Sequence, residues 1–431
     1  MPQRKCSKEI YRKTKINKRI TIPLAKETYL SLVNDANAFR QVIDEMINLY
    51  PELFPPEAAQ GYYLHDQRQS VKMPDVKLRR IKMQEADPTS SRQEVYTIAP
   101  SGLLPYLSGA TDEVEKALFL RRFGVPFWGL TYVFGRNDQY WYRLTTQLGR
   151  YDIVTTTVKA AEAMPQHLLA DEKHAHYHGE RVYIATTVGD DCVLGATLSS
   201  AADTPHLTAA YGTFAQEAKR RQTDYAPTTV NTDGWTATQN AWRALFPAIV
   251  IIECFLHAFI NIRMRCQKKW QTVWPEIQQQ VWDIYHAPDK PIFQERVQAF
   301  GRWAQQAVTG TALAAIEKLC ARADRFIVAF DYPDAYRTST MLDRHMEPMA
   351  RWLFSCRFFH GHLAAAEKQV RAWALLHNFW PYCPRAKICK EFISPAHRLN
   401  RSIYHENWLH NLLVATSLSR VNIIDHKIRQ N

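Results

Sequence analysis

Three strand-like segments that follow one another with no helix between them constrain the fold of this chain most. Residues 167–179, 180–189 and 192–200 are rich in apolar and β-branched side chains. Tight turns at Gly179 and at residues 189–191 separate them, and the aspartates of the second turn are ordinary turn formers. Two successive hairpins of this length predict a three-stranded antiparallel sheet.

After this sheet the pattern alternates between helix and strand. A helix is expected at residues 203–221, with Asp203 or Thr204 as its N-cap. A fourth strand, a second helix and a buried fifth strand follow at residues 227–233, 234–246 and 248–255. The order of three strands, helix, strand, helix and strand is that of a ribonuclease H-like domain, an α/β fold with a mixed five-stranded sheet flanked by helices.

Two aspartates occupy positions that lie side by side in such a sheet. Asp171 is in the middle of the first strand and Asp233 is at the end of the fourth. Their carboxylates could share two divalent cations about 3.5–4 Å apart, the spacing that in-line phosphoryl transfer needs. Magnesium prefers such oxygen ligands, and a third carboxylate is expected from a later helix. An Asp near a strand end is more often a turn or cap residue than a metal ligand. The neighbouring motifs must therefore determine whether a metal site is expected.

Motifs around and beyond Asp233 resemble those of a known family. The sequence Asp233-Gly234-Trp235, followed by Cys254-Phe255-Leu256-His257, is similar to the DG…CxxH signature of DDE transposases of bacterial insertion sequences and Mutator-like elements. Residues 337–344 (RTSTMLDR) resemble the family's RTSN-x-x-E-R segment, and residues 376–381 (LHNFWP) resemble its closing Asn-Phe-x-Pro. This resemblance covers roughly residues 165–384. It implies a transposase that binds the terminal repeats of its element, cleaves DNA with two Mg²⁺ or Mn²⁺ ions and joins the ends to target DNA.

The third acidic residue departs from the family pattern. Asp343 stands where the family has Glu, and Thr340 where it often has Asn. Glu347 lies four residues further on and would project from the same helix face. Asp343 is therefore the expected third ligand, with Glu347 in reserve. If neither reaches the metals, the chain is a decayed or domesticated, catalytically inactive DNA-binding protein.

The Cys254 and His257 motif has two interpretations. A zinc site would need two further ligands, and the sequence shows no complete set of four Cys or His residues at suitable spacing. We therefore expect the pair to pack structurally at the end of the fifth strand, with His257 close to the scissile phosphate.

A helix-turn-helix region is expected at residues 106–152, ahead of the catalytic domain. Residues 111–124, 125–134 and 139–150 read as three short helices joined by tight turns. The third helix would enter the major groove of double-stranded DNA. It would present to the bases a polar set made of Gln139, Arg143, Thr146 and Gln147. A plain three-helix bundle explains the same spacing.

The remaining segments are less informative. Residues 1–105 are expected to form a basic, flexible arm over about the first thirty residues, a helix at 36–49 that stops before Pro51, and a small strand-containing region. An all-α insertion is expected at about 258–330, with a short extended run over its end at 326–333. A helical stretch is then expected at 341–379, with a break near His360. Residues 385–431 are expected to be an irregular tail.

Composition bounds these interpretations. The 431 residues carry 54 Lys and Arg against 42 Asp and Glu, a net charge of +12 that favours polyanions such as DNA. Eight scattered cysteines, a charged N-terminus and no run long enough to cross a bilayer predict a reduced, cytoplasmic protein with no membrane partner. The resemblance to transposases further implies a nucleoid-associated protein of a prokaryotic host. Because both element ends must be cut and joined together, a homo-oligomer, a dimer or higher, is expected on DNA.

Overall fold

The computed structural model describes residues 13–84, 94–105, 109–266 and 270–424. It has a mixed α/β architecture, in which the chain forms two compact units. The first contains residues 1–164 and 351–431, and the second contains residues 165–350. The second unit therefore ends well before residue 384, where the sequence placed the end of the catalytic domain. No helix among the described residues is long and apolar enough to span a membrane.

The second unit is built around a five-stranded mixed sheet in the order β10-β9-β6-β7-β8. Strands β6 (His167–Tyr177), β7 (Glu180–Gly189) and β8 (Cys192–Ser199) form the antiparallel meander that the sequence predicts. Strand β9 (Thr229–Thr232) lies parallel to β6, and β10 (Val250–Glu253) lies parallel to β9. The predicted sequence of elements is thus confirmed.

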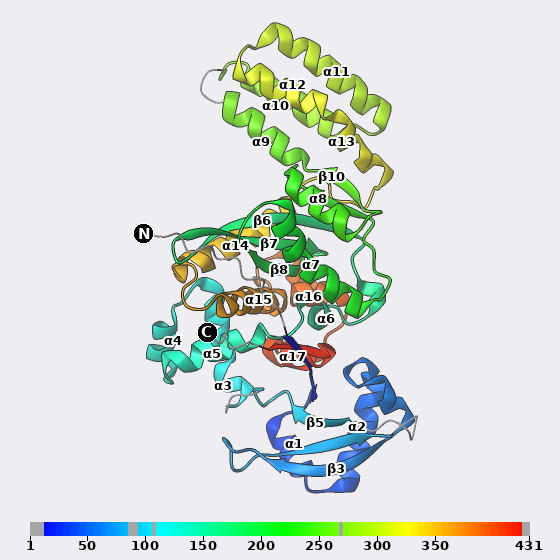
Figure 1. Cartoon of the computed structure of the whole chain (residues 1–431), viewed down its shortest axis with the longest axis vertical. Coiled ribbons are helices and arrows are strands. Elements are labelled where there is room, and N and C mark those ends of the chain that lie inside the picture. The colour runs from blue at the N-terminus through cyan, green and yellow to red at the C-terminus, as the bar shows by residue number, and fades with distance from the viewer. Residues whose placement is uncertain (1–12, 85–93, 106–108, 267–269, 425–431) are drawn as a thin grey trace. The chain divides into compact units, whose positions relative to one another are not determined.

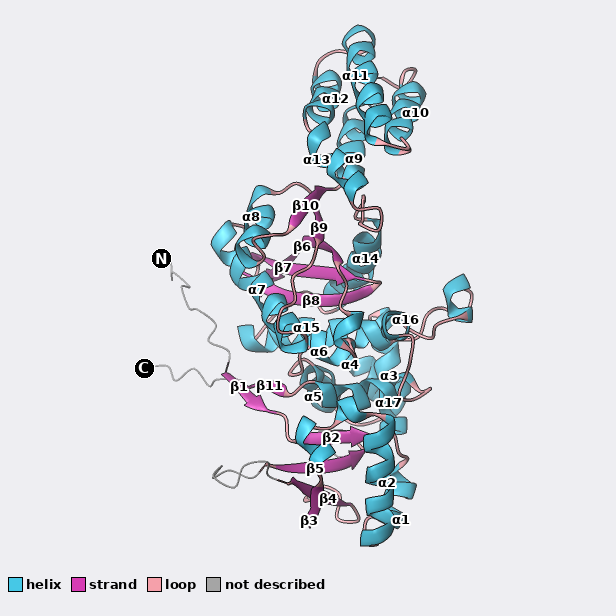
Figure 2. Ribbon diagram, turned by 90° about the vertical axis from the view of Figure 1, so that its right-hand side faces the viewer, coloured by secondary structure: helices cyan, strands magenta, loops and turns pink. Residues whose placement is uncertain are grey.

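Helices α7 (Thr204–Arg221) and α8 (Thr236–Leu245) cover one side of this sheet, and the beginning of α14 (Thr340–Ser355) lies on the other (Figure 2). Asp203 is the N-cap of α7, because its carboxylate accepts a hydrogen bond from the His206 amide at 3.0 Å. An aromatic cluster joins the two helices, with the Tyr211 and Phe214 rings of α7 centred 5.3 and 5.8 Å from the Trp242 ring of α8. This buried layer holds the helices rigidly on the strands that carry the acidic residues.

Five helices between β10 and α14 form the predicted all-α insertion, drawn in yellow-green to yellow beyond β10 in Figure 1. They are α9 (Phe255–Cys266), α10 (Trp274–Tyr285), α11 (Lys290–Ala307), α12 (Thr311–Ala321) and α13 (Ala323–Ile327). The extended run expected at residues 326–333 is wrong: α13 and a 3₁₀ turn (Val328–Asp331) occupy it. Phe326 and Ala329 are three residues apart and both buried, so a helical turn suits them better than a strand.

In the first unit, a four-stranded sheet has the order β2-β5-β4-β3. The strands are β2 (Arg19–Ile22), β3 (Tyr62–Gln69), β4 (Lys77–Met83) and β5 (Val95–Pro100), accompanied by α1 (Lys26–Leu32) and α2 (Ala36–Leu49). Helix α2 has the predicted bounds. The flexible basic arm is wrong for residues 13–32, because Ile20 and Ile22 are fully buried in the sheet. Residues 1–12 of the expected arm lie outside the described residues.

The three helices expected before the catalytic domain are present as α3 (Thr111–Leu120), α4 (Phe127–Phe134) and α5 (Asp138–Leu148), followed by a short α6 (Ile153–Thr157). Asn137 caps α5 by accepting a hydrogen bond from the Tyr140 amide at 2.8 Å. Gly124, which ends the first helical segment, has the left-handed φ of +76° that makes glycine favourable there.

The expected irregular C-terminal tail is also wrong. The chain continues after α14 into α15 (Leu363–Phe379), α16 (Pro395–Asn400), α17 (Trp408–Ala415) and β11 (Val421–Ile424), which pairs with β1 (Lys13–Ile16). Every residue of α17 is buried. Its apolar positions run almost without interruption, a pattern typical of an interior helix rather than of an amphipathic one. The expected break near His360 is confirmed between α14 and α15, with Gly361 at a φ of +81°.

Candidate active site

Strand register places Asp171 and Asp233 side by side. The last paired residues of the parallel strands β6 and β9 are Leu169 and Asn231. Asp171 and Asp233 each lie two positions further along, so both continue the same register at the same edge of the sheet. The two carboxylates affect one another electrostatically, as the pKa of Asp171 shows.

That pKa is raised from 3.8 to about 7. Burial is the largest cause, and the negative charges of Asp233 and Glu172 add to it. Glu172 points toward the helices on its own side, where its Oε1 accepts hydrogen bonds of 2.7 Å from Tyr211 of α7 and Thr238 of α8. Asp171 therefore sits among like charges without an equivalent set of donors.

A tight turn after β9 holds the carboxylate of Asp233 in place. The carboxylate of Asp233 accepts a hydrogen bond from the Trp235 amide at 2.8 Å. Gly234 between them has a φ of +91°, and a Cβ there would lie 2.7 Å from an oxygen of Glu253. Glycine is required on both counts. Glu253 is itself buried, held by ion pairs with Arg322 and Arg325 of the insertion.

The Cys254 and His257 motif connects β10 to the segment that carries the third acidic residue. Cys254 directly follows β10, and its Sγ accepts a hydrogen bond of 3.1 Å from the Ser339 amide. The Ser339 hydroxyl then donates to Asp343 Oδ2 at 3.0 Å. This contact sequence places the start of α14 at the end of β10, next to the strands with the two aspartates.

His257 supplies a positive charge at this edge. Its interaction with Cys254 raises the pKa of His257 to about 9, and the negative charges of Asp171 and Asp233 contribute. Burial raises the pKa of Cys254, but hydrogen bonds from His257 and Ser339 hold it below the ordinary thiol value. The raised pKa favours the protonated imidazole at neutral pH, and its charge interacts with those of Asp171 and Asp233.

Asp343 and Glu347 are both exposed on one side of α14. Asp343 is joined to Cys254 through Ser339, whereas Glu347 lies one turn further along the helix. Across the described residues, no three His, Cys, Asp or Glu side chains converge closely enough to hold a metal ion. The structure places Asp171 and Asp233 at neighbouring positions, with the charge of His257 acting on both, and brings Asp343 to the end of β10 rather than into the pair.

The hairpin turn between β7 and β8 also contacts α14 and the segment just before it. Asp190 and Asp191 both have positive φ, as a tight hairpin turn requires. The Asp190 amide donates to the Tyr336 hydroxyl at 3.1 Å, and the Asp191 carboxylate lies 3.4 Å from Nε2 of buried His345. The sequence predicts only the turn. The pairing with His345 has no local signal, because Asp191 and His345 are 154 residues apart in the sequence.

Two of the four residues expected to read DNA bases do not face solvent. Gln139 and Arg143 are exposed on α5, but Thr146 is buried and Gln147 is half-buried. Thr146 lines a small cavity together with Phe127, Trp373 and Trp380, because this side of α5 lies against α15. The prediction is therefore wrong for Thr146, whose side chain belongs to the core.

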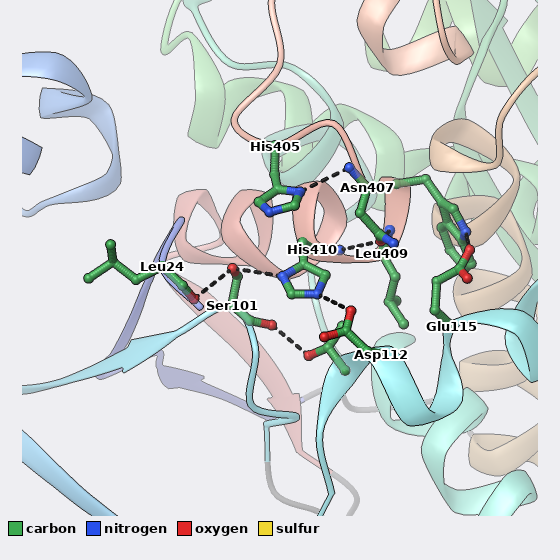
Figure 3. Close-up of polar contacts among 10 residues, drawn as sticks. Leu24, Ser101, Asp112, Glu115, His405, Asn407, Leu409 and His410 are labelled. Atoms are coloured by element: carbon green, nitrogen blue, oxygen red, sulfur yellow. Dashed lines mark hydrogen bonds and ion pairs between the residues drawn. The ribbon is translucent and has the colours of Figure 1, made fainter. Parts of the chain in front are cut away.

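A second polar cluster, in the first unit, contains a serine, a histidine and an aspartate (Figure 3). The Ser101 hydroxyl lies 3.0 Å from His410 Nδ1, and His410 Nε2 lies 3.0 Å from Asp112 Oδ1. These types of residue in this order form the triad of serine hydrolases. Ser101, however, is 0 % exposed, and its hydroxyl also lies 3.3 Å from the Leu24 carbonyl oxygen. A nucleophile that no substrate can reach cannot act, so this cluster is structural.

Comparisons with protein-family models and with curated proteins find no match for this chain. The site must therefore be interpreted from its own geometry.

Proposed function

We propose that this protein is a DNA transposase whose second unit is a ribonuclease H-like catalytic domain. It would bind double-stranded DNA at the ends of its element as a homo-oligomer, cut the strands and join them to target DNA. The observation that carries this proposal is the placement of Asp171, within β6, and Asp233, directly after β9, at matching positions in the register of these parallel strands. Strand order β10-β9-β6-β7-β8, with the first three strands in sequence antiparallel, supports the fold assignment.

The residues present suit a divalent cation. Asp171 and Asp233 supply carboxylate oxygens as metal ligands, and their negative charges repel one another when no cation lies between them. Such an arrangement suits a hard divalent cation. Bound Mg²⁺ or Mn²⁺ would activate an attacking oxygen and stabilise the leaving oxygen at the scissile phosphate. Asp171 and Asp233 would hold it, and Asp343 is the acid best placed to join them, through its link to Cys254.

The chain's own groups divide the remaining work. Asp171 must be ionised to bind a cation, so at sub-saturating cation concentrations the binding of the cation should weaken as the pH falls below about 7. Protonated His257 offers a positive charge beside the carboxylates, where it can stabilise the negative charge of a phosphate. Exposed Gln139 and Arg143 of α5 remain available for DNA contact.

A second candidate function is a catalytically inactive DNA-binding protein derived from a transposase. It is favoured by one observation: no three metal-binding side chains converge among the residues that the structure describes. Both candidates predict salt-dependent DNA binding through the basic surface.

A cleavage and joining assay separates them. Purified protein would be incubated with DNA from the immediate flanks of its gene and with Mg²⁺ or Mn²⁺, beside Asp233→Asn. Metal-dependent nicks and joined products, lost in the variant while DNA binding persists, support the transposase. Binding without cutting by the wild-type protein in either metal supports the inactive protein. Cut ends without joined products would indicate a nuclease instead.

A further inference from the structure

Trp235 belongs to the turn that directly follows β9 and contains Asp233 of the carboxylate pair. It follows Asp233 by two residues in the turn whose geometry is set by Gly234. The turn is closed by the hydrogen bond from the Trp235 amide to Asp233, so backbone and carboxylate are fixed to one another. Movement of the indole relative to Asp233 is therefore limited to its own side-chain torsions.

A second contact removes most of this remaining freedom. The indole Nε1 donates a hydrogen bond of 2.9 Å to the Ala202 carbonyl oxygen, in the segment between β8 and α7. The edge of the ring is thereby anchored, while 53 % of the residue stays exposed. Large aromatic residues on a surface normally gain by burial, so an anchored and exposed ring is a ready binding face.

Several other large apolar residues are exposed, including Tyr63 at 56 % and Met264 at 67 %. Trp235 differs from them because two hydrogen bonds fix it and because its neighbour in the turn is Asp233. An aromatic ring beside a phosphate-cutting centre lies within reach of the nucleotides next to the cut. Stacking on an aromatic ring is open to any base, because each base has a π-face.

We propose that Trp235 is a stacking subsite for an unpaired nucleobase of the DNA strand next to the cleaved bond. This inference rests on the proposed function. It adds that the base beside the cut leaves the duplex and lies on the indole, which holds the adjacent phosphate at Asp171 and Asp233. The anchor to Ala202 acts as the orienting contact for the ring.

The test uses the full chain and two probes, in calcium so that DNA binds without metal-dependent cutting. Each probe is flank DNA with a two-nucleotide single-stranded overhang that carries 2-aminopurine, on one strand or on the other. We expect quenched 2-aminopurine fluorescence with the wild-type protein on one of the probes. Trp235→Ala should abolish the quenching and weaken binding of that probe about 5- to 100-fold. Trp235→Phe keeps a π-face and should stay within about 3-fold of wild type.

Tyr63→Ala is the matched control, because it removes an aromatic ring of similar exposure far from Asp233 in sequence and in the other unit. It should leave both signals unchanged, and thermal unfolding would confirm that each variant is folded. Unchanged binding and quenching in folded Trp235→Ala would overturn the subsite. The same variants are then assayed for cutting in magnesium. Equal cutting by the wild-type protein and Trp235→Ala would contradict the proposed subsite but remain consistent with a transposase. Quenching that depends on Trp235, without any cutting, would support the proposed subsite but contradict the transposase.

Discussion

Two clusters of polar side chains in this protein each contain aspartate, but they differ in how well neighbouring residues balance the charges and hydrogen-bonding groups. Where β6 lies beside the end of β9, Asp171 and Asp233 repel one another, and the pKa of Asp171 rises to about 7. In the first unit, His410 lies between Ser101 and Asp112 with both ring nitrogens within hydrogen-bond distance of a partner. The first arrangement costs stability, whereas the second contributes to it.

The comparison teaches that residue types alone do not identify an active site. Ser101, His410 and Asp112 have the order of a catalytic triad, yet the serine is inaccessible and its neighbours are all protein groups. In the second unit, Asp171 accepts a hydrogen bond from the Glu172 amide and Asp233 from the Trp235 amide, but the charges of the two carboxylates repel each other. A cation bound between them would relieve this repulsion. Substitutions should therefore act in opposite directions at the two clusters.

The largest expected effect is at Asp171. Replacing it by Asn should lower cleavage at least about 1,000-fold, because a metal-binding carboxylate is lost. The same change should stabilise the fold. A carboxyl with a raised folded-state pKa loses stability as pH rises from about 4 to about 7, so the gain in Asp171→Asn should be largest above pH 7, on the order of a few kcal/mol, and disappear near pH 4.

Urea unfolding of both proteins between pH 4 and pH 8, with a chelator present, measures this difference. The matched control is Asp190→Asn, an exposed turn residue in the same unit. If Asp171→Asn were less stable than wild type at pH 8, the carboxylate would be a structural residue and the contrast between the clusters would fail.

The next effect separates the two acids of α14. Asp343→Asn should lower cleavage about 100-fold or more, because Asp343 is the acid joined to Cys254 through Ser339. Glu347→Gln, one helical turn further along, should change it less than about 5-fold. Single-turnover cleavage in magnesium measures both. The opposite ranking would assign the third metal-binding role to Glu347.

Sequence reasoning succeeded where periodicity and turn chemistry are local. The order of elements from β6 to β10 follows from alternation, from turn residues and from Asp203 as a cap, and it places Asp171 and Asp233 correctly. It failed where tertiary burial decides. Ile20 and Ile22 lie in a basic segment that was expected to be flexible, and Thr146 is polar but buried under α15.

The long-range links of the site were equally invisible in the sequence. Ser339 is 85 residues from Cys254, and neither has a distinctive local pattern that announces the contact between them. Trp235 was part of a quoted motif, but its anchor to Ala202 needs the structure. Fold topology was therefore predictable, whereas the supports of the site were not.

A smaller effect is expected at the satisfied cluster. His410→Ala removes the contacts to Ser101 and Asp112 and leaves a cavity beside His405, whose ring stacks on His410 at 4.5 Å. We expect a loss of roughly 2–4 kcal/mol in the free energy of unfolding. Cleavage by the protein that remains folded should be unchanged at low temperature. Chemical unfolding, with cleavage rates normalised to folded protein, tests both statements, and a serine-hydrolase assay should show no activity.

A modest effect on cleavage should come from Ser339→Ala, a change next to the carboxylate pair that alters neither of its two aspartates. The hydroxyl donates to Asp343, and the backbone amide bond to Cys254 survives the change. We expect a reduction in cleavage of about 10-fold together with a higher magnesium concentration for the half-maximal rate, since Asp343 loses the contact that orients it. Ser339→Thr, which keeps the hydroxyl, should restore most of the rate. Equal loss in the Ala and Thr variants, at unchanged magnesium dependence, would show that Ser339 only fills space between β10 and α14, and that Asp343 is oriented by the helix alone.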